Sequence, residues 1–282
     1  MEWLERPIFR AGPITSNSFQ LSGGPFIRPR QWQQQLIQLL RRRLDPASTA
    51  GRDVLVHAGP GAGKTLGALL SFRSMQAEGR LQHFMVFCHR TSILQQWRSA
   101  ASRVGLELVE WTADGDHRQA AGWLVTYQGA GRQRQSLLAA LARWRPEELL
   151  AIADEAHHLG VDPEEADGPI WGRTFLDLSQ HCRLRLGLTG TPFRADNLAF
   201  CAARRVRVDN GGGLVEQISP DLSVEPRELI AAGDVRPLEF RFQDGWVEHS
   251  REGLPDRDVS PLSAEQRESW RARNLRRAIR LG

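Results

Sequence analysis

The sequence predicts an α/β protein in which a parallel sheet carries helices on both faces. Along the 282-residue chain, short apolar runs alternate with longer stretches of helical periodicity. The run 149–153 (LLAIA) is continuously apolar, and 185–190 (RLGLTG) is predicted to be another buried strand. Such runs are typical of central parallel strands that are covered on both faces. The alternation of strands and helices therefore favours a doubly wound sheet.

The first half of the chain supplies most of this alternation. Residues 1–25 are rich in Gly, Pro, Ser and Asn, and we expect them to form a flexible lead-in. The elements expected next are a helix from Arg30, a strand at 53–58, a helix from Lys64 to Gly79, a strand at 83–88, a helix at 92–104 and strands at 106–111 and 122–127.

The second half continues the pattern and then departs from it. The expected elements are a helix at 137–144 closed by Pro146, a strand at 149–153, a helix at 175–182, a strand at 185–190 and a short helix at 226–232. An Asp-Gly pair with alternating flanks predicts a β-hairpin over 238–250. Ser263 and Gln266 form a capping box, which predicts that a basic helix runs from there to the end.

Composition excludes several classes of protein. The net charge of +4 is too small to indicate a nucleic-acid partner by itself. Three distant cysteines do not make a disulfide framework, and no apolar segment is long enough for a membrane span or a secretion signal. We therefore expect a cytoplasmic protein without a membrane partner. Its α/β domain should cover 26–230, and a hairpin with a linker helix should cover 231–282.

The chain contains a single lysine, Lys64, and it lies in a phosphate-binding pattern. The segment 58–65 reads AGPGAGKT, which differs from G-x-x-x-x-G-K-[ST] by an alanine at the first position. Lys64 is expected to reach the β and γ phosphates of ATP, and the Thr65 hydroxyl to ligate Mg²⁺. Three glycines allow a tight turn whose N–H groups point at phosphate oxygens. They are Gly59, Gly61 and Gly63.

A second polar group follows the apolar strand at 149–153. Asp154-Glu155-Ala156-His157 places carboxylates at the C-terminal end of a strand, where α/β sheets bind ligands. We expect Asp154 to hold Mg²⁺ through water, and Glu155 to orient and deprotonate the attacking water. A solvated surface pair is the alternative, and the preceding buried strand disfavours it. Lys64, Asp154 and Glu155 are therefore the candidate catalytic residues.

Together, AGPGAGKT and DEAH resemble superfamily 2 DEAD/DEAH-box helicases, in particular the branch of type III restriction-enzyme helicase subunits. The resemblance covers about 26–230 and implies a RecA-like P-loop NTPase lobe. The segment 27–31 (IRPRQ) is similar to that branch's L-R-P-Y-Q, whose glutamine reads adenine. This similarity implies adenine contacts by Gln31 and Arg28. An ordinary helix-start glutamine is the alternative reading of Gln31.

Two further segments are similar to family motifs that contact the nucleic-acid backbone. The segment 89–97 (HRTSILQQW) has His-Arg where the family has Pro-Thr, and the resemblance implies contacts by Arg90 and Thr91. A solvated arginine is the alternative for Arg90. The Thr-Tyr-Gln segment implies a backbone contact by Thr126, whereas Tyr127 has a core role as an equal alternative.

One more segment is similar to the motif that couples the ATP site to the nucleic acid. Residues 188–194 read LTGTPFR, and the resemblance implies that Thr189 and Thr191 act through His157. A plain turn and a core histidine are the corresponding alternatives.

The family's second lobe carries an arginine motif, Q-x-x-G-R-x-x-R, that nothing after Arg194 matches. The resemblance thus implies that a second RecA-like lobe, in a missing C-terminal part or a partner chain, completes the hydrolytic site. We expect an ATP-dependent DNA helicase or translocase lobe that binds ATP and Mg²⁺ but hydrolyses ATP slowly by itself. The alternatives are a non-motor ATP-dependent switch or assembly module, and an RNA helicase lobe.

Overall fold

The computed structural model describes residues 27–115, 117, 119–159, 168–190, 204–209, 214–236, 247–249 and 257–259. The chain divides into two units, Met1–Arg236 and Pro237–Gly282. Four of the expected features lie outside the described residues, wholly or in part. They are the lead-in at 1–25, Thr191, the first strand and turn of the hairpin at 238–250, and the basic helix after Ser263.

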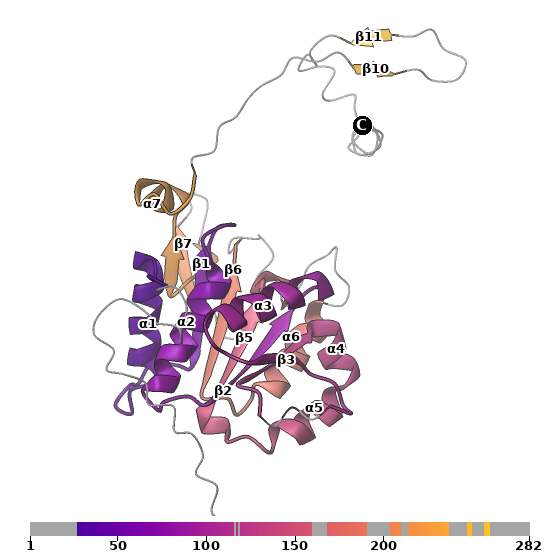
Figure 1. Cartoon of the computed structure of the whole chain (residues 1–282). Coiled ribbons are helices and arrows are strands. Elements are labelled where there is room, and N and C mark those ends of the chain that lie inside the picture. The colour runs from indigo at the N-terminus through magenta and orange to yellow at the C-terminus, as the bar shows by residue number, and fades with distance from the viewer. Residues whose placement is uncertain are drawn as a thin grey trace, which may run out of the picture. The chain divides into compact units, whose positions relative to one another are not determined.

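The first unit is built on a seven-stranded sheet with the order β3-β4-β2-β5-β6-β1-β9 (Figure 1). Every neighbouring pair in it is parallel. The strands are β1 (Asp53–Ala58), β2 (His83–Cys88), β3 (Leu108–Glu110), β4 (Gly122–Thr126), β5 (Leu149–Asp154), β6 (Leu184–Thr189) and β9 (Leu222–Val224). The predicted α/β class with a parallel sheet is confirmed.

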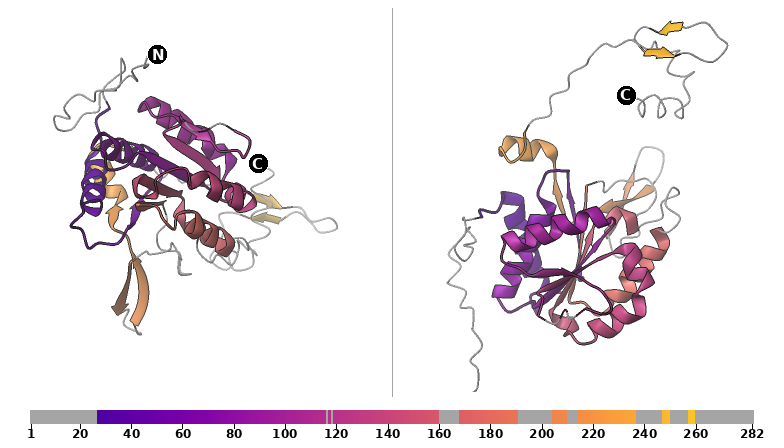
Figure 2. Two further views of the ribbon diagram at one scale, coloured as in Figure 1. Left: turned by 90° about the horizontal axis from the view of Figure 1, so that it is seen from below. Right: turned by 45° about the vertical axis from the view of Figure 1, so that its right-hand side comes forward.

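Helices cover both faces of this sheet (Figure 2). One face carries α1 (Gln31–Arg43), α2 (Lys64–Ala77) and α3 (Thr91–Arg103). The other carries α4 (Tyr127–Arg132), α5 (Arg134–Leu141) and α6 (Gly168–Leu178). The short helix α7 (Pro226–Ala231) follows β9, and two 3-10 helices, η1 (Pro146–Glu148) and η2 (Ala156–Leu159), flank β5. Among the described residues, no helix combines the length and the apolar character that a membrane crossing requires.

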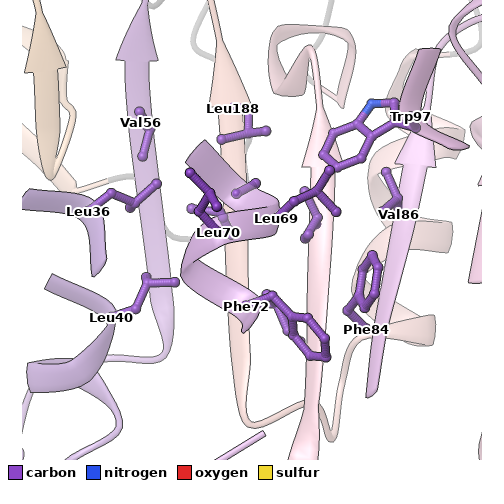
Figure 3. Close-up of a cluster of buried hydrophobic side chains, with 14 of the residues drawn as sticks. Leu36, Leu40, Val56, Leu69, Leu70, Phe72, Phe84, Val86, Trp97 and Leu188 are labelled. Atoms are coloured by element: carbon purple, nitrogen blue, oxygen red, sulfur yellow. The ribbon is translucent and has the colours of Figure 1, made fainter. Parts of the chain in front are cut away.

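Alternate residues of each central strand point into two separate cores. In β1, Val54 and Val56 belong to the cluster beneath α1, α2 and α3, whereas Leu55 belongs to the cluster on the other face. Val86 and Phe87 of β2 divide in the same way. Figure 3 shows the first cluster, in which leucines of α1 and α2 lie against the sheet. Full burial of such a side chain contributes about 1.5–3 kcal/mol to stability, so both faces hold the sheet in place.

The helix α4 is absent from the sequence prediction, which extended the strand at 122–127. The strand instead ends at Thr126, and the helix begins at Tyr127. The Thr126 hydroxyl caps this helix by accepting a hydrogen bond from the N–H of Gly129 at 3.0 Å. Two glycines within six residues hide the helical tendency of the segment, because glycine is a poor helix former.

Other boundaries also differ from the prediction. The helix expected at 137–144 is α5 at Arg134–Leu141, and the helix expected at 175–182 is α6 at Gly168–Leu178. The prediction missed β9, which is three residues long, and the antiparallel pair of β7 (Arg204–Asp209) and β8 (Leu214–Ser219). A strand as short as β9 has too few residues to display a period, so the sequence pattern alone does not locate it.

In the described residues of the second unit, β10 (Val247–His249) and β11 (Arg257–Val259) form an antiparallel pair. The hairpin predicted over 238–250 would pair β10 with residues before the Asp-Gly turn. Those residues and the turn lie outside the described part of the chain. The described partner of β10 is instead a later segment.

A buried ion pair joins β1 to β6 where the two strands begin. Asp53 and Arg185 are paired in register, and their side chains are only 10% and 8% exposed. The guanidinium donates to both carboxylate oxygens, with Nη2 2.8 Å from Oδ2. We expect Asp53→Ala to lower the free energy of unfolding by about 3–5 kcal/mol, because it leaves a buried charge without its partner. Urea denaturation measures this loss.

The matched control is Asp177→Ala, which removes the ion pair between Asp177 and Arg134. These side chains are 46% and 39% exposed, and an exposed pair contributes about 1 kcal/mol or less. Equal losses in the two variants would contradict the structural role of the buried pair.

Candidate functional site

The register of the sheet brings three segments that are distant in sequence to one edge. His57 of β1 lies beside Thr189 of β6, and Asp154 of β5 lies beside Leu188 of β6. Since all three strands are parallel, their carboxyl ends lie at the same edge of the sheet. Open α/β sheets bind ligands outside this edge.

The loop between β1 and α2 has the backbone that phosphate binding requires. Gly61 and Gly63 have φ angles of +75° and +83°, a backbone conformation that residues other than glycine rarely adopt. Gly63 is also the N-cap of α2, whose 14 residues give it a positive N-terminal end that faces the loop. N–H groups at such an end form a favourable site for an anion.

Lys64 bridges this loop to the acidic segment. Its Nζ donates to the Ala58 carbonyl at 3.0 Å and lies 3.7 Å from Glu155 Oε1. A Cβ at Gly190 would lie 3.4 Å from the same Nζ, so β6 also reaches this point. An ammonium has three donors, and the two contacts leave capacity for a phosphate oxygen.

Asp154 is the last residue of β5 and is only 6% exposed. Its Oδ1 accepts from the backbone N–H of Glu155 at 3.1 Å, and its Oδ2 accepts from the indole N–H of Trp97 at 2.7 Å. Burial raises the pKa of the Asp154 carboxyl to about 6, and the hydrogen bond from Trp97 partly offsets the rise. A nearby cation would favour the ionised carboxylate.

Glu155 has a strained backbone conformation, and its side chain lies between Lys64 and His157. In the described part of the chain it is the one non-glycine residue with a positive φ, at 48°. Its Oε1 faces Lys64, and its Oε2 lies 3.4 Å from Nδ1 of His157. That nitrogen is also 3.2 Å from the hydroxyl of Thr189, which is fully buried. Backbone strain of this kind is concentrated at functional sites.

The residues predicted to contact nucleic acid lie at the same edge of the sheet. Arg90 and Thr91 are exposed at the start of α3. Thr126 is half-buried, and its hydroxyl is engaged in capping α4. Tyr127 is only 1% exposed and donates its hydroxyl to the Asp154 carbonyl at 2.8 Å. The structure therefore favours the core alternative for Tyr127.

The predicted adenine contacts stand at the start of α1. Arg28 and Gln31 are both exposed there. The glutamine that reaches the phosphate loop is Gln33, which is 1% exposed and donates to the Gly63 carbonyl at 3.0 Å.

Sequence reasoning missed three side chains that hold the phosphate loop by donating hydrogen bonds to its backbone carbonyls. They bind the consecutive carbonyls of residues 61–63. Arg30 Nη1 donates to the first two at 3.0 and 2.8 Å, Trp32 Nε1 to the second at 3.1 Å, and Gln33 to the third. Because C=O and N–H point in opposite directions in a trans peptide, holding these carbonyls orients the N–H groups that follow them.

Arg30 also connects the loop to the segment after α7. Its Nη2 donates to the Asp234 carbonyl at 2.7 Å, and its Nε lies 3.5 Å from Asp234 Oδ1. The Arg-Pro-Arg-Gln segment was the available signal, but the family's tyrosine stands where this chain has Arg30, so the resemblance did not point to it.

We expect Arg30→Ala to weaken ATP binding about tenfold, since a hydrogen bond from a charged donor contributes about 1.5–3 kcal/mol and these are partly exposed. Titration with a fluorescent ATP analogue measures the affinity. Arg41→Ala is the matched control, because Arg41 lies on the same helix and pairs with Glu78 instead. Equal affinity in both variants would show that the loop needs no support from Arg30.

Comparison with known proteins gives a family match over the same part of the chain. The family model ResIII, described as type III restriction enzyme, res subunit, matches residues 26–194. The match exceeds half of the 282 residues and contains both the phosphate loop and the Asp154–His157 segment.

Curated relatives from mycobacteria are similar to nearly the whole chain. A Mycobacterium tuberculosis (strain H37Rv) protein is 31% identical over 284 residues, covering 93% of this chain and 44% of the relative. A Mycobacterium leprae protein is 29% identical over 275 residues, and the match covers 94% of this chain and 43% of the relative. Both carry the description "uncharacterized protein". The chain thus spans less than half the length of these relatives.

Three solved structures are partly similar. The SWI2/SNF2 ATPase core of Sulfolobus solfataricus in complex with dsDNA has a TM-score of 0.45 and 21% identity, covering 59% of this chain and 32% of that one. The UvsW helicase of bacteriophage T4 has a TM-score of 0.46 and 12% identity, and the match covers 64% of this chain and 58% of that one. A nuclease-deletion mutant of the type ISP restriction-modification enzyme LlaGI has a TM-score of 0.45 and 15% identity, and the match covers 74% of this chain and 21% of that one. At these scores the likeness is partial, and the family match is the stronger finding.

Proposed function

The chain belongs to the family of type III restriction enzyme res subunits, and on that premise we propose that it is the ATP-binding lobe of an ATP-dependent DNA helicase or translocase. The family match confirms the resemblance to this helicase branch that the motifs predict. The observation that carries the proposal is that Glu155 lies beside both Lys64 and His157, although Lys64 and Glu155 are 91 residues apart in the sequence.

The residues at this edge of the sheet fit ATP with Mg²⁺. The glycine loop and Lys64 would hold the phosphates, and the Thr65 hydroxyl and the Asp154 carboxylate are the oxygen ligands that Mg²⁺ prefers. When bound, Mg²⁺ neutralises charge on the β and γ phosphates. The described residues contain no cluster of three or more His, Cys, Asp or Glu suited to a metal ion. This agrees with a magnesium ion that takes most of its ligands from phosphate and water.

We assign Glu155 the role of general base. Its carboxylate would orient the attacking water and take its proton, while Lys64 neutralises charge on the phosphates. His157 lies between Glu155 and Thr189. We assign His157 and Thr189 a coupling role: they would link Glu155, the proposed base, to the end of β6. Thr191, which follows β6 in the sequence, would belong to the same link.

The proposed nucleic-acid contacts follow the ends of β2 and β4. Cys88 and Thr126 are paired in register, so Arg90 and Thr91 lie near the end of the strand that precedes α4. Contacts of this type bind the phosphate backbone without reading sequence, and the affinity falls as salt rises. We favour DNA over RNA. A second RecA-like lobe, from a longer protein or a partner chain, would supply the arginine that completes hydrolysis.

Binding and ATPase assays on the purified chain test this function. We expect binding to DNA that weakens steeply with salt, and slow ATP hydrolysis that DNA stimulates. Binding of ATP without affinity for any nucleic acid at low salt would instead support a non-motor switch or assembly module. Tighter binding of RNA than of DNA in a side-by-side titration would support an RNA helicase lobe.

A further inference from the structure

Trp97 lies deep in the first core cluster but carries a polar contact to the ATP site. Figure 3 shows its ring among Leu69 and Val86, with the indole nitrogen at one end of the cluster. The side chain is completely buried, and its Nε1 donates to Asp154 Oδ2 at 2.7 Å. These two residues come from different elements, α3 and β5, and are 57 positions apart.

The indole leaves the carboxylate of Asp154 little freedom. One oxygen is held by Trp97, and the other accepts the backbone N–H of Glu155. Tyr127 fixes the main chain at the same point through the Asp154 carbonyl. The plane of the carboxylate is thereby set, and only the remaining lone pairs are available for a metal ion or its water.

We propose that Trp97 is a positioning residue, which holds the Asp154 carboxylate in the orientation for Mg²⁺ and ties the metal site to α3. The inference rests on the proposed function, since it takes Asp154 as the ligand of Mg²⁺ and the start of α3 as a nucleic-acid contact. Groups that orient a metal ligand without touching the metal typically change metal affinity about 10–100-fold when removed.

The geometry explains why this position holds a tryptophan. A phenylalanine would fill much of the same apolar space, but it has no N–H for the buried carboxylate. A charged group away from water needs hydrogen bonds. Because α3 starts at Thr91, next to Arg90, a shift of this helix on nucleic-acid binding would act on Asp154 through the indole.

Metal binding by Trp97→Phe tests the inference. We would titrate the full chain with Mn²⁺ in the presence of ADP and follow free Mn²⁺ by electron paramagnetic resonance. The expected result is an affinity for Mn²⁺ that is about 10–100-fold weaker, with ADP affinity in EDTA unchanged. Trp123→Phe is the matched control: Trp123 is 4% exposed, and its indole donates to the His117 carbonyl at 3.1 Å. This variant should bind Mn²⁺ as the wild type does.

Equal Mn²⁺ affinity in Trp97→Phe and the wild type would overturn the inference alone. A wild-type chain that binds no Mn²⁺ with ADP would overturn the proposed function as well. A second measurement needs no variant. The ¹H–¹⁵N indole resonance of Trp97, assigned through its contacts in the core, should shift when Mg²⁺ is added to the ADP-bound protein. An unchanged resonance under saturating Mg²⁺ would contradict the role of Trp97.

Discussion

Glu155→Gln should stop ATP hydrolysis while leaving the binding of ATP with Mg²⁺ intact. Glutamine has nearly the same shape, so Lys64 and His157 keep a neighbour in the same place. It has no basic oxygen to take a proton from water, and a general base contributes about 10²–10⁴-fold to the rate. Single-turnover phosphate release with excess protein measures the loss, because it detects the slow turnover of one lobe. A fluorescent ATP analogue measures the binding.

Glu148→Gln provides the matched control for this substitution. Glu155 directly follows β5, whereas Glu148 directly precedes it and so lies at the other end of the strand. There Glu148 pairs with Arg145 at 2.9 Å. Its replacement should leave the rate of hydrolysis unchanged. If Glu155→Gln releases phosphate at the wild-type rate, another group is the base.

The second large effect is expected for Lys64→Ala, which should weaken the affinity for ATP with Mg²⁺ about 10–100-fold or more. The ammonium makes charge-assisted hydrogen bonds to phosphate, each of which contributes about 1.5–3 kcal/mol. Isothermal titration calorimetry gives the affinity, and a thermal melt confirms that the variant is folded.

Lys64→Arg separates charge from shape at this position. The side chain of Lys64 is 11% exposed and lies within 4 Å of Glu155, with Gly190 alongside. A planar guanidinium fits such a place poorly. We therefore expect Lys64→Arg to bind ATP almost as weakly as Lys64→Ala. Wild-type affinity in Lys64→Ala would remove Lys64 from the binding site, and wild-type affinity in Lys64→Arg would show that charge alone is sufficient.

Local patterns were sufficient to predict the main strands and the glycine-rich turn between β1 and α2. The run 149–153 is apolar because β5 lies at the centre of a sheet covered on both faces, and burial of that kind is visible in composition. The loop is visible because its glycines, Lys64 and Thr65 are consecutive. Asp154 and Glu155 could be assigned because they directly follow a recognisable strand. Each of these predictions depends on neighbours in the sequence.

The supports of the site could not be predicted, because they depend on contacts between distant segments. Trp97 meets Asp154 only once α3 packs on β5. The contact between Arg30 and Asp234 spans 204 residues. A residue's type says nothing of such a partner until the topology is known. The helix α4 was missed for another reason: its two glycines disfavour a helix locally, and the burial of Tyr127 and Ala130 that supports it depends on the fold.

Acetylation of Lys64 tests the central claim, that the loop between β1 and α2 binds ATP with Mg²⁺ through Lys64, most directly. Lys64 is the only lysine of the chain, so its amine is the single side-chain target for an acetylating reagent. Mass spectrometry of the peptide that contains it gives the rate, and the α-amino group of the chain serves as an internal control. We predict that ATP with Mg²⁺ slows acetylation of Lys64 and leaves the α-amino group unaffected. Equal rates for Lys64 with and without saturating ATP would contradict the assignment of the phosphate loop.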